Sequence, residues 1–135
     1  MFTLEIEPRF SDTDALGHIS NTSLPVWFEQ GRTPIFRIFH PTLEVKTWPL
    51  ILARIEVDFL AQSYWHMPVE IRTGVGEIGN SSFRVIQEAW QDGRKVARGV
   101  SVLIHFDYEH EKSVPIPEEI KAKLAACRID RAIAE

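Results

Sequence analysis

A polar loop near the N-terminus gathers side chains that can do acid–base or nucleophilic chemistry. Two carboxylates, an imidazole and an amide fall within residues 12–21: Asp12, Asp14, His18 and Asn21. Apolar residues then recur at spacings of three and four from Leu24 to Phe39, which predicts an amphipathic helix directly after the loop. A helix N-terminus presents unpaired backbone N–H groups and the positive end of the helix dipole. It can therefore stabilise an oxyanion while a carboxylate acts as base or nucleophile.

Asp14 is the residue that we expect to be catalytic. Alone it would be read as an ordinary turn residue, because Asp is common in such loops, but the polar residues around it favour catalysis. Asp12 is expected to order the loop by accepting backbone N–H bonds. Asn21, Thr22 and Ser23 can each cap the helix. The backbone amide of Asn21 can at the same time be the oxyanion donor.

Two further loop residues have more than one interpretation. His18 either has a functional role, binding the carbonyl side of a substrate or orienting Asp14, or forms a structural hydrogen bond with a neighbouring backbone group. Gly17 supplies a positive φ or lets a substrate approach the backbone. Asp12, Asp14 and His18 are also possible metal ligands, but no second cluster completes a coordination shell. We therefore expect neither a metal nor another cofactor.

The rest of the chain must position this loop and helix. Alternating apolar residues predict strands at 2–9, 49–63, 69–75, 82–90 and 96–108. In the second strand the expected inward face is Ile51, Ala53, Ile55, Val57 and Phe59. In the last strand a stripe of small residues, Ala97, Gly99 and Ser101, indicates a closely packed helix or simply a neighbouring strand.

Proline and glycine mark where elements begin and end. Pro34 lies beyond the first turn of the predicted helix, so we expect a kink or break near residues 30–34. Asp92-Gly93 predicts a hairpin turn between the last two strands. Pro117 and the two acids after it predict a C-terminal helix.

Composition limits the class of protein. A chain of 135 residues predicts one domain, residues 1–135, and a net charge of −4 predicts no nucleic-acid partner. No apolar run approaches the length of about 20 residues that a membrane span needs, and the N-terminus lacks the pattern of a signal peptide. One cysteine, Cys127, excludes an internal disulfide, so we expect a cytoplasmic protein.

The order of elements predicts an α+β fold. One strand, a long helix, four antiparallel strands and a short helix suit a five-stranded antiparallel sheet wrapped around a long central helix, which is the hotdog fold. The apolar face of the helix is too wide to remain in water, so the curved sheet must cover it.

The loop and helix resemble the 4-hydroxybenzoyl-CoA thioesterase family of hotdog acyl-CoA thioesterases. The resemblance rests on R-F-x-D-T-D-x-x-G-H-x-x-N, followed by Phe28-Glu29 and Arg32, and extends over nearly the whole chain. It implies hydrolysis of an acyl-CoA thioester, with Asp14 as the catalytic carboxylate and the amide near Asn21 polarising the carbonyl. It also implies a homodimer with sheets joined edge to edge, often paired into a homotetramer, with active sites between chains.

Several assignments remain open at this point. Glu29 is a reserve nucleophile, because a related hotdog branch uses a helix carboxylate, and it can instead pair with Arg32. Ser82 is a strand residue that could also reach the substrate. The segment 77–81 lacks the basic cluster that some family members place against the CoA phosphates, and Arg94, Lys95 or Arg98 can replace it.

Two other functions compete with thioester hydrolysis. A hotdog hydratase or dehydratase would use Asp14 and His18 as an acid–base pair, and a non-catalytic protein would only bind an acyl thioester. The sequence leaves open the acyl length, an aryl or aliphatic acyl group, and CoA or acyl carrier protein as the carrier.

Overall fold

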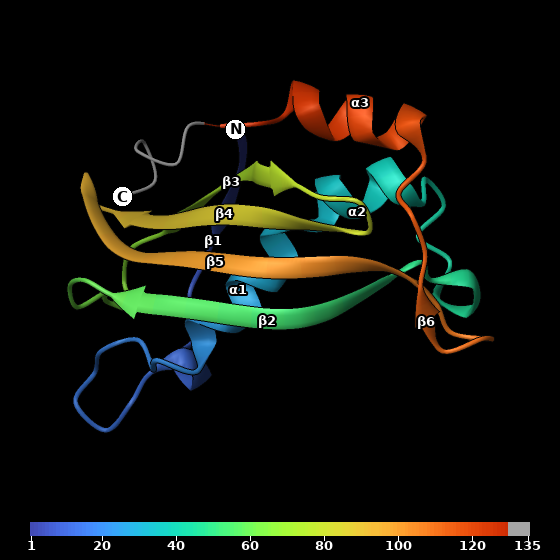
Figure 1. Ribbon diagram of the computed structural model, residues 1–135. Coiled ribbons are helices and arrows are strands. Elements are labelled where there is room, and N and C mark those ends of the chain that lie inside the picture. The colour runs from blue at the N-terminus through green and yellow to red at the C-terminus, as the bar shows by residue number, and fades with distance from the viewer. Residues whose placement is uncertain (130–135) are drawn as a thin grey trace.

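The protein, described over residues 1–129 in a computed structural model, is built on one curved antiparallel sheet (Figure 1). The strands follow the order β1-β3-β4-β5-β2, and the short β6 pairs with the end of β5. Their bounds are Phe2–Ile6 for β1, Leu50–Phe59 for β2, Val69–Ile78 for β3, Ser82–Gln91 for β4, Arg94–Asp107 for β5 and Lys112–Ser113 for β6. The α+β hotdog arrangement predicted from the sequence is confirmed, with β6 as an addition.

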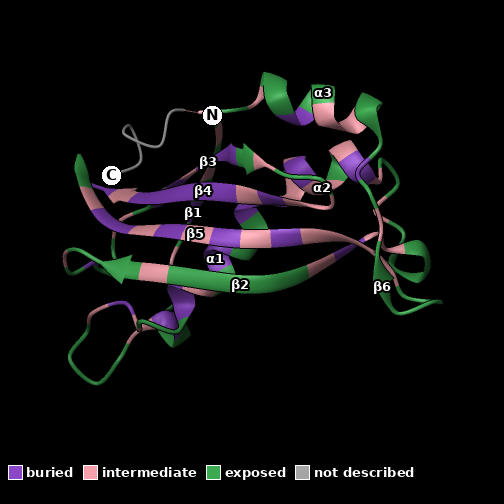
Figure 2. Ribbon diagram, viewed as in Figure 1, coloured by how far each residue is buried: buried purple, intermediate pink, exposed green. Residues whose placement is uncertain are grey.

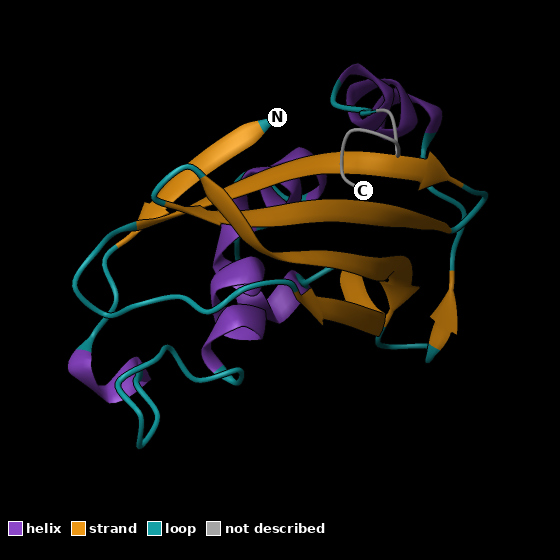
Figure 3. Ribbon diagram, turned by 90° about the vertical axis from the view of Figure 1, so that its left-hand side faces the viewer, coloured by secondary structure: helices purple, strands orange, loops and turns teal. Residues whose placement is uncertain are grey.

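The central helical layer is two helices rather than one. α1 covers Ser23–Gly31 and α2 covers Thr33–Phe39, and both lie on one face of the sheet (Figure 3). The helix is interrupted at Arg32, which places Pro34 in the first turn of α2. The N–H that proline lacks would have no helical hydrogen-bond partner at this position. The predicted break is therefore confirmed, and the single long helix is corrected to segments of nine and seven residues.

The core between helices and sheet has two apolar clusters. One contains Trp27 and Phe28 of α1, and the other contains Ile35 and Phe39 of α2 together with Leu124 of the C-terminal helix α3, Glu118–Ala126. α3 packs against α2 and β3. None of the helices within residues 1–129 has the length and apolar character that crossing a membrane requires.

Two glycines let α1 approach the sheet closely. A Cβ at Gly31 would lie 2.7 Å from Ile71 Cγ2, and a Cβ at Gly99 would lie 3.0 Å from the Phe28 ring. The stripe of small residues on β5 therefore marks the close approach of a helix, as one of the two sequence interpretations predicted. Below Gly31, Gln87 Nε2 donates hydrogen bonds to the carbonyl of Phe28 at 2.7 Å and to Thr73 Oγ1 at 3.0 Å.

β2 is an exposed edge strand, and its inward face differs from the predicted one. The register with β5 shifts between Leu52 and Arg54, so a bulge separates the two halves of β2. Leu52 pairs with the buried Leu103, so Leu50 and Leu52 share the concave face with Ile55 in place of Ile51 and Ala53. Figure 2 shows that most of β2 is exposed while β4 is largely buried.

The strand ends carry the other differences from sequence. β2 ends at Phe59 rather than at residue 63, because the backbone N–H groups of Leu60 and Ala61 both donate to the Val96 carbonyl and turn the chain away. The predicted hairpin is confirmed: Asp92 and Gly93 have φ of 52° and 71°, as its tight turn requires. β1 is shorter than predicted and ends at Ile6.

Candidate active site

The loop before α1 is folded back on itself. Thr13 and Ile19 form an antiparallel bridge, and the Asp14 amide donates to the His18 carbonyl at 2.7 Å. Gly17 has a φ of +80°, so the positive φ that the sequence suggested is present. A side chain at that position would be strained by the backbone although no atom lies within 4 Å of its Cβ. The loop is therefore a compact structure that holds Asp14 in place.

The Asp14 side chain is exposed and oriented by the loop backbone. Its Oδ1 atom accepts hydrogen bonds from the amides of Leu16 at 2.8 Å and His18 at 3.1 Å. No group within residues 1–129 donates a hydrogen bond to Oδ2. One oxygen thus fixes the carboxylate, and the other is available to a substrate or a water molecule.

Asp12 is buried and stabilises the loop from beneath. Its carboxylate accepts bonds from the Arg9 amide at 2.7 Å, from the Arg9 guanidinium and from Ser23 Oγ at 3.3 Å. Burial by itself would raise the pKa of Asp12, but these hydrogen bonds and the charge of Arg9 together hold the pKa below its usual value. The expectation that Asp12 orders the loop through a backbone N–H is confirmed.

The start of α1 lies beside Asp14. None of the three predicted capping side chains accepts an amide of the first helical turn: Ser23 Oγ bonds Asp12, and Thr22 Oγ1 lies 2.8 Å from Ser20 Oγ. Asn21 is exposed at the turn before the helix, and within residues 1–129 its backbone N–H has no acceptor. An amide in this state can bind an oxygen of a ligand.

Asp14 and Asn21 line one cavity of about 610 Å³. Another part of the cavity wall is formed by the end of β2 and the following segment, which no motif in the sequence assigns to the site. Its residues are Phe59, Leu60, Ala61, Gln62 and Ser63. Gln91 holds this segment through bonds with the backbone of Tyr64 and Met67. The cavity therefore combines a carboxylate, a free amide and an apolar strand end.

Other residues predicted for the site do not line this cavity. The His18 imidazole packs edge-on against Tyr64, with ring centroids 5.5 Å apart, and His18 bonds Asp14 only through its backbone amide and carbonyl. Glu29 lines a different cavity on the next turns of the helical layer. Ser82 is the first residue of β4 and pairs with Ile104. It lies at the opposite end of β4 from Gln91, whose side chain bonds the backbone of Tyr64 next to the cavity wall. Gly17 shapes the Asp14 loop without lining the cavity.

Two of the three basic residues considered for the CoA phosphates are already in ion pairs. Lys95 Nζ lies 2.7 Å from Glu88 Oε2, and Arg98 Nε lies 2.9 Å from Asp58 Oδ2. Arg94 is exposed at the hairpin.

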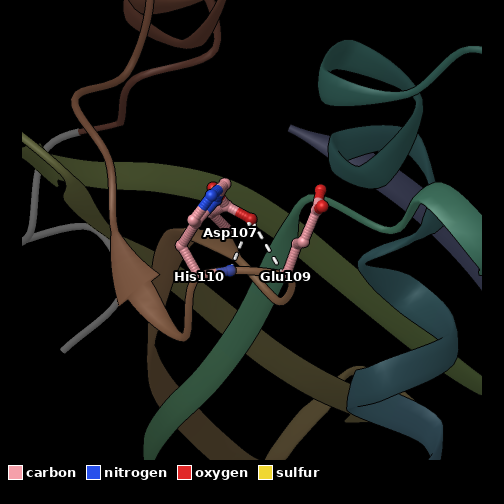
Figure 4. A group of neighbouring side chains, drawn as sticks. All are labelled: Asp107, Glu109 and His110. Carbon is pink, nitrogen blue, oxygen red and sulfur yellow. Dashed lines mark hydrogen bonds and ion pairs between the residues drawn. The ribbon is translucent and has the colours of Figure 1, made fainter.

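Within residues 1–129, one group of side chains has its possible metal ligands close together. It consists of Asp107, Glu109 and His110 in the β5–β6 turn (Figure 4). Asp107 Oδ1 accepts the amides of Glu109 at 2.9 Å and His110 at 3.2 Å, and its Oδ2 lies 2.6 Å from His110 Nδ1. These bonds are those of a capped turn. Asp12, by contrast, is paired with Arg9 and is not grouped with Asp14 and His18.

Comparisons with known proteins agree with this arrangement. Uncharacterized protein YsmA of Bacillus subtilis (strain 168) is 26% identical over 128 residues, 94% of this chain and 87% of YsmA. The structure of a predicted thioesterase from Bacillus stearothermophilus is 42% identical, with a TM-score of 0.94 over 96% of this chain and 97% of that one. A thioesterase from Thermus thermophilus, solved with coenzyme A and Zn, is 28% identical, with a TM-score of 0.82 over 93% and 92% of the two chains. The family model of the thioesterase-like superfamily matches residues 8–124, so the chain belongs to that superfamily, as its resemblance to hotdog thioesterases implied.

Proposed function

We propose that this protein is an acyl-CoA thioesterase that hydrolyses the thioester to a free acid and CoA. The observation that carries the proposal is the shared cavity of Asp14 and Asn21, in which an available carboxylate oxygen and a free backbone amide lie at one helix start. Thioester hydrolysis needs both groups: one to attack or activate water, the other to stabilise the oxyanion. Coenzyme A bound to the Thermus thermophilus relative supports CoA as the carrier.

The residues support two routes with the same outcome. In both, the thioester oxygen accepts a hydrogen bond from the Asn21 amide, and the dipole of α1 stabilises its developing charge. Asp14 either removes a proton from the attacking water or attacks the carbon itself to form an anhydride that water then hydrolyses. The C–S bond breaks, the sulfur leaves as the CoA thiol, and the acyl group leaves as the acid.

The working form is proposed to be a homodimer joined through β2, with pairing into a tetramer as a further step. β2 is a strand of ten residues whose outer edge pairs with no other strand of residues 1–129, and its apolar side chains Leu52, Ile55 and Phe59 are 41%, 40% and 52% exposed. Long apolar edges of this kind pair readily with another strand. Antiparallel pairing of two β2 strands along their full length would place Leu50 of one copy opposite Phe59 of the other, closing each Asp14 cavity with the partner's β2.

A panel of acyl-CoA thioesters, assayed with a thiol-detecting reagent, tests the function. We expect release of free CoA with a rate that depends on acyl length and type. Hydration of an enoyl-CoA without thiol release would support the hydratase alternative, and tight binding without turnover would support a non-catalytic protein. Either outcome would overturn the proposal.

A further inference from the structure

A second cavity, of about 500 Å³, lies between the α1–α2 junction and the first half of β2. Its wall is mainly apolar and includes the side chains of Phe36, Trp48, Leu50, Leu52 and Leu103. Phe36 and Trp48 pack edge-on, with ring centroids 5.2 Å apart. A surface of this kind suits a hydrocarbon or aryl group.

One charged side chain in this wall is buried without a carboxylate in direct contact, although the charge of Glu29 acts on it from a greater distance. Arg32 is 2% exposed, and no carboxylate within residues 1–129 lies within 4.0 Å of its guanidinium. Its Nη1 atom donates to Gln87 Oε1 at 3.3 Å, and its Nε atom is buried with no partner in the described part of the chain. Glu29 lines the same cavity but is exposed, and it does not form an ion pair with Arg32. A buried cation in this state is costly unless a ligand completes its hydrogen bonds.

A purely structural role explains only part of this arrangement. Arg32 links the helix break to Gln87, but Gln87 already ties the helical layer to the sheet through Phe28 and Thr73. Within residues 1–129, neither Nε nor Nη2 donates to an acceptor. Nε has almost no accessible surface, so Nη2 is the nitrogen of this pair that a carboxylate in the cavity can reach. The hydroxyl of Ser101, on the same face of the sheet as Gln87, is also buried, and no group within residues 1–129 bonds it.

The position of the cavity relative to Asp14 points to the partner subunit. Along one chain, Asn21 and Arg32 are eleven residues apart, about 16 Å at the rise of an α-helix. Full-length antiparallel pairing of β2 would instead place the Leu50 end of one copy, with its Arg32 cavity, beside the Phe59 end of the other, with its Asp14 cavity. An acyl group held at Asp14 of one copy would then extend into the Arg32 cavity of the other copy.

We propose that the Arg32 cavity binds the far end of the acyl group and that the preferred substrates are acyl-CoA thioesters whose apolar chain ends in a carboxylate. This inference rests on the proposed thioesterase function and on the β2 dimer. The apolar wall holds the chain, and Nη2 of Arg32 receives the terminal carboxylate.

Paired substrates of equal chain length test the inference on the unmodified protein. Hexanoyl-CoA and adipoyl-CoA differ only in a terminal carboxylate, as do octanoyl-CoA and suberoyl-CoA. We expect kcat/KM to be about tenfold or more higher for the carboxylated member of at least one pair, because a site built around a polar group rejects the analogue that lacks it. Equal or faster hydrolysis of the neutral members would overturn the inference and leave the thioesterase function intact. Absence of hydrolysis for all four, with CoA released from other members of the acyl-CoA panel, would overturn the inference alone, and absence of hydrolysis for the whole panel would overturn both.

Variants separate substrate recognition from a structural role. Arg32→Met should remove the preference, mainly by raising KM for the carboxylated substrate, while hydrolysis of the neutral one changes little. Arg32→Lys should keep part of the preference that Arg32→Met loses, since lysine retains the positive charge but lacks the planar guanidinium. Arg37→Met, a change of an exposed arginine on α2, is the matched control and should behave as wild type. Equal loss on both substrates after Arg32→Met, with Arg32→Lys giving no recovery, would show a structural role and overturn the inference.

Discussion

At the scale of single residues, the two loop carboxylates have different environments. Asp14 is exposed and has one oxygen available, whereas Asp12 is buried and fully engaged by Arg9 and Ser23. The same residue type at two nearby positions of one loop therefore has a catalytic setting in one case and a structural setting in the other. Asp14→Asn should therefore affect activity, and Asp12→Asn should affect stability.

Asp14→Asn should abolish most of the turnover and leave the fold intact. The change is nearly isosteric, and the amide oxygen can still accept the bonds from Leu16 and His18. It removes the base or nucleophile, so we expect kcat to fall on the order of a hundredfold or more. Rates from the acyl-CoA assay, with circular dichroism to verify folding, measure the effect.

The matched control is Asp92→Asn in the β4–β5 turn. Asp92 is exposed, does not line the Asp14 cavity, and has a positive φ that asparagine tolerates. It should retain the wild-type rate. A folded Asp14→Asn protein with near wild-type turnover would remove Asp14 from the mechanism.

Asp12→Asn should lower stability, and the loss should depend on pH. The native pKa of Asp12 is depressed, so its charged form stabilises the native state above the unfolded pKa of about 3.9. That contribution is lost as the pH falls through the native value. At pH 7 we expect a loss of about 1–2 kcal/mol, carried more by the Arg9 amide and Ser23 than by the exposed Arg9 guanidinium.

Urea unfolding of wild type and Asp12→Asn between pH 7 and pH 3 measures this effect. The difference in free energy of unfolding should be largest near neutral pH and should shrink below about pH 4. A difference that stayed constant over the whole range would mean that the charge of Asp12 is not what stabilises the loop.

At the scale of elements, the distance between α1 and the sheet depends on Gly31. On an open helix, alanine in place of glycine stabilises by up to about 1 kcal/mol. Here the new Cβ would lie 2.7 Å from Ile71 Cγ2 and 3.0 Å from Gln87 Nε2, so the helix must move away. We expect Gly31→Ala to cost about 1–3 kcal/mol in urea unfolding despite its better helix propensity. A variant as stable as wild type would show that the contact relaxes freely.

The sequence predicts those elements whose conformation depends on one or two neighbouring residues. Pro34 predicted the helix break, because the proline ring excludes this residue from the interior of a continuous helix. Asp92-Gly93 predicted the hairpin, because both residues adopt the positive φ that its tight turn requires. The bulge in β2 and the end of this strand at Phe59 depend on pairing with β5, whose partners for residues 52–59 lie between 38 and 51 positions further along the chain. The alternation of apolar residues within β2 therefore predicts neither of them.

The site shows the same division. Asp14, Asn21 and the loop around them were predictable because they are neighbours in sequence. The wall at residues 59–63 and the link between Arg32 and Gln87, 55 positions apart, arise only when the sheet folds over the helices. The sequence offered Arg32 as a partner for Glu29, and the structure instead buries it beneath the helix break.

At the scale of the whole molecule, we expect the exposed β2 edge to pair with a second copy of the chain. Light scattering at micromolar concentration should give a mass above the 15.5 kDa of one chain. Ile55→Lys places a charge on the apolar face of this edge and should weaken dimerisation on the order of tenfold or more. Thr3→Lys, exposed on β1 at the opposite edge of the sheet, is the control and should leave the mass unchanged. A wild-type mass of one chain would contradict the dimer.

Subunit mixing tests whether one active site uses both chains. A mixed dimer contains one Asp14→Asn protomer and one Arg32→Met protomer. One of its two sites would combine the intact Asp14 of the Arg32→Met protomer with the intact Arg32 of the Asp14→Asn protomer. Equal mixing of freely exchanging subunits should therefore recover about a quarter of the wild-type activity on adipoyl-CoA, because half of the dimers are mixed and each has one complete site. If each chain used its own Arg32, no mixed dimer would contain a complete site, and activity after exchange would equal the mean of the two variants. Assays before and after exchange of the same mixture distinguish these outcomes, and a recovery that Ile55→Lys abolishes would place the shared site at the β2 edge.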